Sequence, residues 1–263
     1  MRAFAPGSVT AIFAPGEAAD RSKGASFAIE DGVIADVEPR DGADQSVVAV
    51  DGEPTDFEPV ELALEKLGVT AAAVDLTAEV PIGRGFGASG AATLATALAA
   101  NEEFALDRTR EELVEVAHRA EVEAGTGLGD VFVQEMGGLV VGDGGDPRRF
   151  ERDDPVEYAS FGPIATEEAL ADEELMERIA REGTAALDGL PAEPLLADLT
   201  RTAWVFAQAI DLPTDEVREA VAEVEAAGGV ASMAMVGETV FGVGAEGVLP
   251  NRTTICAEGA HLL

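Results

Sequence analysis

Cysteine and histidine are almost absent from this chain of 263 residues. Cys256 is the single cysteine, so no disulfide can form within the chain and a secreted disulfide scaffold is excluded. His118 and His261 are the only histidines, which leaves no Cys/His cluster that could bind zinc. No run of about 18 apolar residues occurs, so no helix is expected to span a membrane. Pro6 and Pro15 interrupt the N-terminal stretch, which does not resemble a signal peptide, and the sequence predicts a soluble cytoplasmic protein.

Basic residues are also scarce. The chain has 17 Lys and Arg and 51 Asp and Glu, which give a formal net charge of −34. Only Lys23 and Lys66 are lysines. Such a surface repels phosphate backbones and anionic lipids, so neither nucleic acid nor a membrane is expected as a partner. At molar salt the Debye length falls to roughly 3 Å and the repulsion between carboxylates is screened. The composition is therefore typical of a halophile's cytosolic protein, with an ordinary acidic mesophile protein as the alternative.

The apolar content is high enough for a real core. Hydrophobic residues make up 47% of the chain, which excludes global disorder. The length allows two small domains or one large one, and no repeat of fixed period is present. The charged, turn-like segment Gly142–Pro155 predicts a boundary between an N-terminal domain, residues 1–150, and a C-terminal domain, residues 151–263.

The first seventy residues are mostly strands and turns, and helices follow one another later in the chain. Strands are expected at Val9–Phe13, Ser26–Ile29, Val33–Val37, Val47–Val50, Ala72–Val80, Ala231–Val236, Thr239–Val243 and near Thr253–Ala257, with tight turns at Asp31-Gly32, Asp41-Gly42 and Asp51-Gly52. Helices are expected at Pro59–Leu67, Ala91–Ala100, Thr109–Ala124, Thr166–Glu182, Leu195–Ala209 and Thr214–Ala227. Thr109 and Glu112 form a capping-box pattern at the start of the third helix. Mixed strands and helices with antiparallel hairpins indicate an α+β fold.

The segment PIGRGFGASGAA, residues 81–92, is the most informative in the chain. Its glycines at 83, 85, 87 and 90 allow a sharp turn and expose consecutive N–H groups, and the helix expected to begin near Ser89 adds unsatisfied donors. This pattern predicts an anion site suited to nucleotide phosphates, because a plain strand-to-helix turn needs one glycine. A Walker loop is excluded because no lysine is near. The letters fit a Rossmann G-x-G-x-x-G, but a helix, not a second strand, follows.

Three blocks in order resemble the GHMP kinases, which include galactokinase, homoserine kinase and mevalonate kinase. The family's phosphate loop reads Pro-x-x-x-Gly-Leu-Gly-Ser-Ser-Ala; here Phe86 replaces the leucine and Ala88-Ser89-Gly90 replaces Ser-Ser-Ala. APGSVTAIFAP, residues 5–15, resembles the N-terminal substrate block, and GGVASMAMVGETVF, residues 228–241, resembles the C-terminal glycine-rich block. Within the family, the first block, HRAEVEAGTGLGDV and SMAMVGETVF look most like archaeal pantoate kinases.

The resemblance implies a GHMP kinase fold, with an N-terminal phosphate-loop domain of mixed sheet plus helices and a C-terminal ferredoxin-like α/β-sandwich domain. It implies that ATP and Mg²⁺ are the cofactors and that the primary hydroxyl of pantoate is phosphorylated on the archaeal route to coenzyme A. The residues expected to bind ATP are Pro81, Gly83, Arg84, Gly85, Phe86, Gly87, Ala88, Ser89, Gly90 and Ala91. Those expected to contact the acceptor are Ser8, Thr10, Arg21, Lys23 and Gly127.

Two carboxylates carry the expected chemistry. Asp130 closes the loop GTGLGD and is expected to accept the proton of the attacking hydroxyl, with a helix N-cap as the alternative. Ser89 and Glu121 are expected to bind Mg²⁺, with Glu123 as the competing ligand and an N-cap as the other role of Ser89.

The remaining alternatives concern cations, packing and substrate. Arg84 is assigned to phosphate or substrate, and Arg21 and Lys23 to the pantoate carboxylate. His118 and Trp204 are expected to pack within the protein. The alternative functions are a GHMP kinase for shikimate, homoserine or mevalonate, and a binding protein of GHMP fold without catalysis. Whether the protein forms a homodimer is left open by the sequence.

Overall fold

Two β-sheets form the frame of the protein. The structure is a computed structural model that describes residues 1–263 except 17–21, 41, 144–145, 164–172 and 236. In the described residues the first sheet has eight strands in the order β12-β1-β2-β5-β3-β4, with β6 and β7 attached beside β2. Its strands are β1 (Arg2–Pro15), β2 (Ser22–Pro39), β3 (Val47–Val50), β4 (Glu53–Pro54), β5 (Ala72–Ala78), β6 (Leu139–Gly142), β7 (Arg148–Phe150) and β12 (His261–Leu262). Only β3 and β5 pair in parallel among them.

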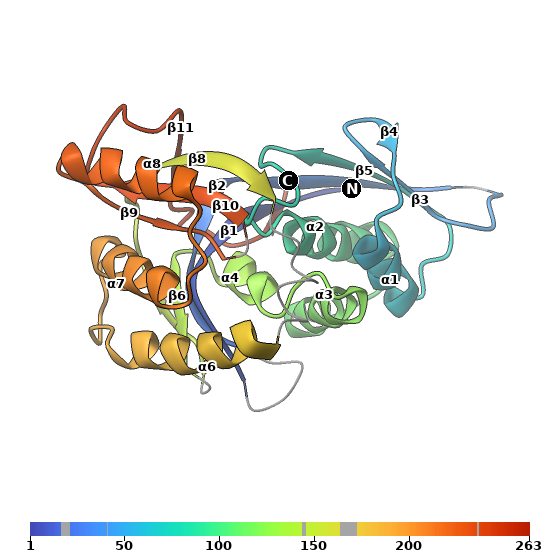
Figure 1. The fold of residues 1–263 in the computed structure, drawn as a ribbon. Coiled ribbons are helices and arrows are strands. Elements are labelled where there is room, and N and C mark those ends of the chain that lie inside the picture. Colours follow the sequence, from blue (N-terminus) through green and yellow to red (C-terminus); the bar gives the residue numbers. More distant parts are fainter. Residues whose placement is uncertain (17–21, 41, 144–145, 164–172, 236) are drawn as a thin grey trace.

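Four helices pack against one another, and two of them, α2 and α4, also pack against β1 and β2 (Figure 1). They are α1 (Glu58–Leu67), α2 (Ala88–Glu103), α3 (Arg110–Ala124) and α4 (Asp130–Met136). α2 is apolar on nearly all sides, which is typical of a helix enclosed by other elements. The capping box of Thr109 and Glu112 forms as predicted, and Gly125 ends α3 in the left-handed conformation. α2 and α3 carry Ser89 and Glu121 of the site described below, and α4 carries Asp130.

The second sheet is antiparallel, in the order β11-β8-β10-β9. Its strands are β8 (Pro155–Pro163), β9 (Val230–Met233), β10 (Gly237–Val243) and β11 (Asn251–Thr254), and its helices are α6 (Glu173–Asp188), α7 (Leu196–Ala209) and α8 (Asp215–Ala226). Trp204 lies partly buried in the cluster between α7, α8 and this sheet. Among the described residues, no helix is long and apolar enough to cross a membrane.

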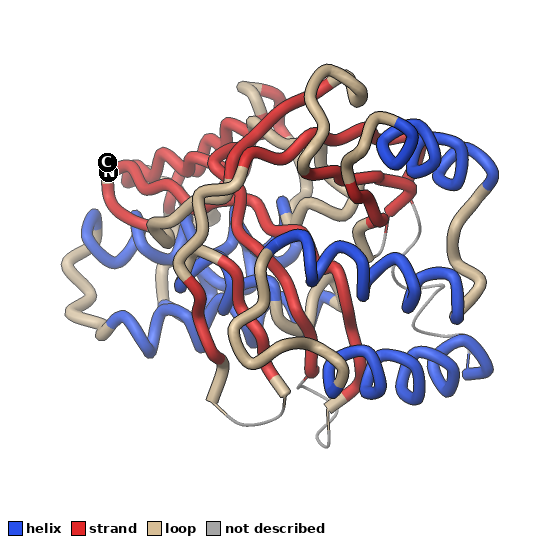
Figure 2. The backbone as a smooth tube through the Cα atoms, turned by 90° about the vertical axis from the view of Figure 1, so that its left-hand side faces the viewer, coloured by secondary structure: helices blue, strands red, loops and turns tan. Residues whose placement is uncertain are grey.

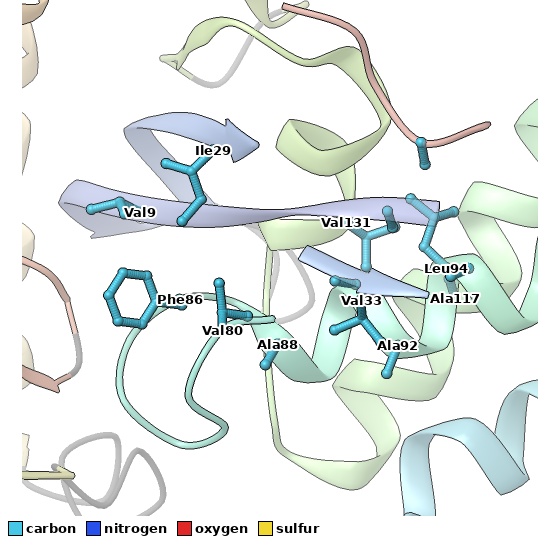
Figure 3. Packing of buried hydrophobic residues seen from close by; sticks show 14 of the residues in the cluster. Val9, Ile29, Val33, Val80, Phe86, Ala88, Ala92, Leu94, Ala117 and Val131 are labelled. Carbon is cyan, nitrogen blue, oxygen red and sulfur yellow. The ribbon is translucent and has the colours of Figure 1, made fainter. Parts of the chain in front are cut away.

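Aromatic contacts join the two sheets. The ring centroids of Phe27 on β2 and Phe241 on β10 are 5.3 Å apart, and those of Phe86 and Tyr158 are 4.8 Å apart. Figure 3 shows Phe86 and Val80 in the same buried cluster as Val9 on β1. Figure 2 shows the strands of the two sheets running between the helices, with both ends of the chain side by side. The α+β prediction is confirmed, and the division into residues 1–150 and 151–263 stays a prediction.

One of the three predicted Asp-Gly turns is wrong. β2 continues through Asp31 and Gly32 without a hairpin, because Gly32 serves close packing: a Cβ there would lie 2.2 Å from the carbonyl oxygen of Ala5. Asp51 and Gly52 do form a turn, with φ of 52° and 79°. Gly42 has φ of 76°, and Asp41 lies outside the described residues.

Several predicted boundaries shift. The helix predicted at Thr166–Glu182 runs on to Asp188, and residues 166–172 lie outside the described residues. It passes through Gly183 because that glycine packs against β1, where a Cβ would lie 2.1 Å from the carbonyl oxygen of Phe13. The strand predicted to reach Val236 ends at Met233, and the last one covers Asn251–Thr254.

Candidate active site

The glycine-rich loop connects β5 to α2. Gly83, Gly85 and Gly87 have φ of 73°, 86° and 61°, a backbone region that other residues rarely adopt. Gly87 is the N-cap of α2 and no side chain caps the helix, so Ser89 is not the N-cap. The first N–H groups of α2 thus keep no side-chain partner, which leaves donors and the positive end of the helix dipole for an anion.

Backbone and side-chain contacts fix this loop to both sheets. The N–H of Ser8 donates to the Phe86 carbonyl oxygen at 2.8 Å. The Thr239 hydroxyl donates to the Arg84 carbonyl oxygen at 2.7 Å, and a Cβ at Gly237 would lie 2.5 Å from that oxygen. The C-terminal glycine-rich block therefore contacts the glycine-rich loop of residues 81–92 directly.

Glu121 on α3 is a buried carboxylate, 3% exposed. Its Oε1 accepts hydrogen bonds from the Ser89 hydroxyl at 2.9 Å and the Thr93 hydroxyl at 2.7 Å, and its Oε2 accepts one from Thr126 at 2.8 Å. Burial raises the pKa of Glu121, the three hydroxyl bonds oppose that rise, and the charge of Asp130 adds to it. A carboxylate in this state gains from a cation beside it.

Glu123 lies elsewhere. Its side chain is exposed, and its Oε2 is 2.5 Å from the Lys66 ammonium on α1. Two helical positions apart correspond to about 200°, so the two glutamates point in nearly opposite directions from α3. Only Glu121 contacts Ser89 in the structure.

Asp130 is the first residue of α4, whose N-cap is Gly129. Asp130 is therefore not the N-cap, contrary to the structural alternative considered for it. Its Oδ1 accepts hydrogen bonds from the Ser8 hydroxyl at 3.0 Å and the Thr10 hydroxyl at 3.2 Å, both on β1. Burial raises the pKa of Asp130, and these two hydroxyl bonds oppose the rise. Thr10 in turn accepts from the Ser26 hydroxyl at 3.0 Å.

The two carboxylates face each other across Gly127. A Cβ at Gly127 would lie 3.2 Å from Glu121 Oε2 and 3.6 Å from Asp130 Oδ2. Within the part of the chain that the structure describes, Oδ2 accepts no hydrogen bond. This oxygen is the one left available to a ligand.

Of the predicted cations, the structure describes Lys23 and Arg84. Lys23 pairs with Ala14 near the end of β1, and strand alternation places it on the face of β2 opposite Ser22 and Ser26. Arg84 lines a cavity of about 320 Å³ with Pro81, Tyr158, Ser160 and Asn251. Arg21 lies outside the described residues. The structure thus brings Ser8, Thr10, Gly127, Asp130, Ser89 and Glu121 together, but not Lys23.

The sequence analysis did not identify several hydroxyl and amide side chains that lie in this site. They are Ser22, Ser26, Thr93, Thr126 and Gln134. Thr93 and Gln134 each follow a predicted site residue by four positions on a helix, which puts them on the same face. This spacing of four residues is the sequence signal that could have identified Thr93 and Gln134. His118, by contrast, is buried with its ring 4.9 Å from that of Phe132.

Known proteins share this arrangement of elements. Residues 58–138 match the family described as GHMP kinases N terminal domain. The pantoate kinase of Thermococcus kodakarensis is 31% identical over 92% of this chain and 86% of that protein, and that of Methanospirillum hungatei is 29% identical over 93% and 87%. A solved structure titled "Phosphotransferase related to CoA biosynthesis pathway" is 28% identical with a TM-score of 0.85, and the match covers 100% of this chain and 98% of that one.

Proposed function

The chain belongs to the GHMP kinase family, and on this premise we propose that it transfers the γ-phosphoryl group of ATP to the primary hydroxyl of pantoate. The product would be 4-phosphopantoate, on the route to coenzyme A. The observation that carries the reaction type is one cluster that joins the glycine-rich loop, the hydrogen-bonded pair of Ser89 and buried Glu121, and an Asp130 oxygen that has no donor among the described residues. The observation that carries the substrate is the full-length similarity to curated pantoate kinases.

ATP phosphates would bind at the loop of residues 81–91 and the N-terminus of α2. The reasons are the N–H groups of α2 that no side chain caps and the positive φ of three glycines in the loop, a backbone conformation that side chains would disfavour. In a chain of charge −34, backbone donors attract an anion without requiring scarce basic side chains. Phosphoryl transfer depends chiefly on such positioning.

A divalent cation fits beside Ser89 and Glu121. The donors are a carboxylate and a hydroxyl, both oxygen, as Mg²⁺ prefers, and the carboxylate is buried without a basic partner in the described residues. Mg²⁺ bound there would neutralise charge on the nucleotide phosphates. Glu121 and Ser89 would hold it, while Thr93 and Thr126 orient the carboxylate.

Asp130 would receive the proton of the pantoate hydroxyl. As that oxygen attacks the γ-phosphorus, the bond to the β,γ-bridging oxygen breaks and ADP departs. Ser8 and Thr10 hold Oδ1, so the proton would go to Oδ2, which faces Gly127. Burial that raises the pKa of Asp130 makes it a better proton acceptor.

An acceptor panel tests this proposal. ADP release is measured at molar KCl with ATP, Mg²⁺ and, in turn, pantoate, shikimate, homoserine and mevalonate, and the phosphorylated product is identified. Turnover with pantoate is expected. Turnover with mevalonate alone would refute the substrate, whereas ATP binding without turnover on any acceptor would favour a binding protein. A cytoplasmic location and a homodimer stay proposals, the second tested by light scattering at the same salt.

A further inference from the structure

Gln134 on α4 is a fully buried polar side chain at the centre of the site. Its Nε2 donates to the carbonyl oxygen of Gly87 at 2.7 Å and to the Ser8 hydroxyl oxygen at 3.4 Å. It follows Asp130 by four positions, so both side chains leave the same face of α4. One residue thus contacts the phosphate loop and a hydrogen-bond donor of Asp130.

The chemistry fixes which way the amide points. A carbonyl oxygen only accepts, so the atom that faces Gly87 must be the nitrogen. Gln134 Oε1 is then buried and finds no hydrogen-bond partner among the residues that the structure describes. It lies against Gly90, where a Cβ would be 2.8 Å away, so glycine at this position makes room for the amide.

A buried amide whose oxygen has no hydrogen-bond partner does not favour the stability of a packed core. A buried acceptor without a partner destabilises the folded state, and an apolar side chain of similar size would avoid this penalty. Removing Nε2 would leave neither of its two partners without a hydrogen bond. The Gly87 carbonyl oxygen also accepts from the N–H of Ala91 at 3.0 Å, and the Ser8 hydroxyl still donates to Asp130. Stability alone therefore does not account for glutamine here.

The two contacts of Nε2 have separate effects. The bond to Gly87 ties the last turn of the phosphate loop to α4, the helix that begins with Asp130. The bond to Ser8 uses a lone pair of that hydroxyl, so its proton is directed at Asp130 Oδ1. Oδ2 is then the oxygen that remains for the acceptor.

We propose that Gln134 is a positioning residue that sets the distance between the bound phosphates and Asp130 and keeps Asp130 Oδ2 turned toward the acceptor. This inference rests on the proposed function. Misplacement of reacting groups by about 1 Å can lower a rate on the order of a hundredfold. The kinetic effect of Gln134 should therefore exceed its effect on stability.

Gln134→Met tests the proposal, since methionine keeps the length and apolar bulk and removes both donors. We expect kcat to fall about tenfold to a hundredfold, a rise in the KM for ATP, and a melting temperature equal to or above that of the unchanged protein. Gln208→Met, the same exchange on the exposed surface of α7, is the matched control and should leave all three unchanged. Unchanged kcat in Gln134→Met, or a loss of activity that merely follows a lowered melting temperature, would overturn the proposal.

A second variant and a double-mutant cycle complete the test. Gln134→Glu keeps the shape but cannot donate to Gly87 when ionised, so it should also lower kcat and ATP affinity. In the Asp130→Asn background, Gln134→Met should lower kcat much less than in the unchanged protein, because both act on one proton transfer. Full additivity would overturn the proposal. An unchanged protein that is inactive on pantoate would instead refute the proposed function, and ATP binding by the Gln134 variants would still report on the loop.

Discussion

Replacing Asp130 with asparagine separates catalysis from stability at a single atom. The asparagine oxygen can still accept from Ser8 and Thr10, which hold Oδ1 at 3.0 and 3.2 Å. The amide nitrogen takes the place of Oδ2 and cannot receive a proton. The exchange therefore preserves the hydrogen bonds that orient the side chain and removes only the proposed proton acceptor.

The expected loss follows from what a positioned base contributes. Removal of a general base lowers kcat by about 10²–10⁴-fold, which corresponds to about 2.7–5.5 kcal/mol of transition-state free energy. The dissociation constant for ATP should change little, because no hydrogen bond joins Asp130 to the described residues of the phosphate loop. The assay is single-turnover phosphoryl transfer together with equilibrium ATP binding. Turnover near the normal rate would show that Asp130 only positions the acceptor.

Asp130→Asn should raise the stability of the fold at neutral pH, although it lowers kcat. Burial raises the pKa of Asp130 above its ordinary value of 3.8, so the ionised side chain favours unfolding at neutral pH. For such a group, the stability it contributes is present below the unfolded pKa and is lost as the pH rises through the folded pKa. Asp130→Asn should thus melt higher than the unchanged protein at pH 7, and the difference should vanish near pH 4. A lower melting temperature at pH 7 would refute this assignment.

Three further outcomes are expected. Glu121→Gln should lower activity in a way that high Mg²⁺ partly restores, while Glu123→Gln, which removes only the exposed pair with Lys66, should do little; the reverse pattern in a magnesium titration would assign the metal to Glu123. Thr239→Val should raise the KM for ATP about fivefold, the equivalent of about 1 kcal/mol for one hydrogen bond to the Arg84 carbonyl; an unchanged KM would show that Gly237 packing suffices. Folding should require roughly molar KCl, because only then are 51 acidic residues screened; an equal melting temperature in about 50 mM salt would contradict this.

Local patterns predicted the parts of the site that depend on backbone geometry. Four glycines within ten residues indicated the phosphate loop, and three of them do adopt positive φ. Helical spacing did not separate Glu121 from Glu123, but the resemblance to the GHMP kinases favoured Glu121, which is the buried one of the two in the structure. The sequence could thus point to the right loop and, through the resemblance, to the buried glutamate.

The hydroxyl partners could not be predicted in the same way. Ser8 and Thr10 come within hydrogen-bond distance of Asp130 only because the chain returns to β1 after about 120 residues. Serine and threonine carry no periodic signal that marks such a contact. The predictions of a turn at Gly32 and of a helix end before Gly183 were wrong for a related reason. Glycine is compatible with a turn, a helix end or a close approach between backbones, and the neighbouring strand determines which of these it adopts.

In the described part of the chain, the donors to the two carboxylates are all neutral hydroxyls: Ser8 and Thr10 for Asp130, and Ser89, Thr93 and Thr126 for Glu121. Mobile ions weaken attraction between charges but leave hydrogen bonds between buried neutral groups and a carboxylate largely untouched. The exterior and the catalytic interior can therefore be altered independently. A redesigned exterior with fewer exposed acids should yield an enzyme for dilute buffers whose catalytic centre needs no change.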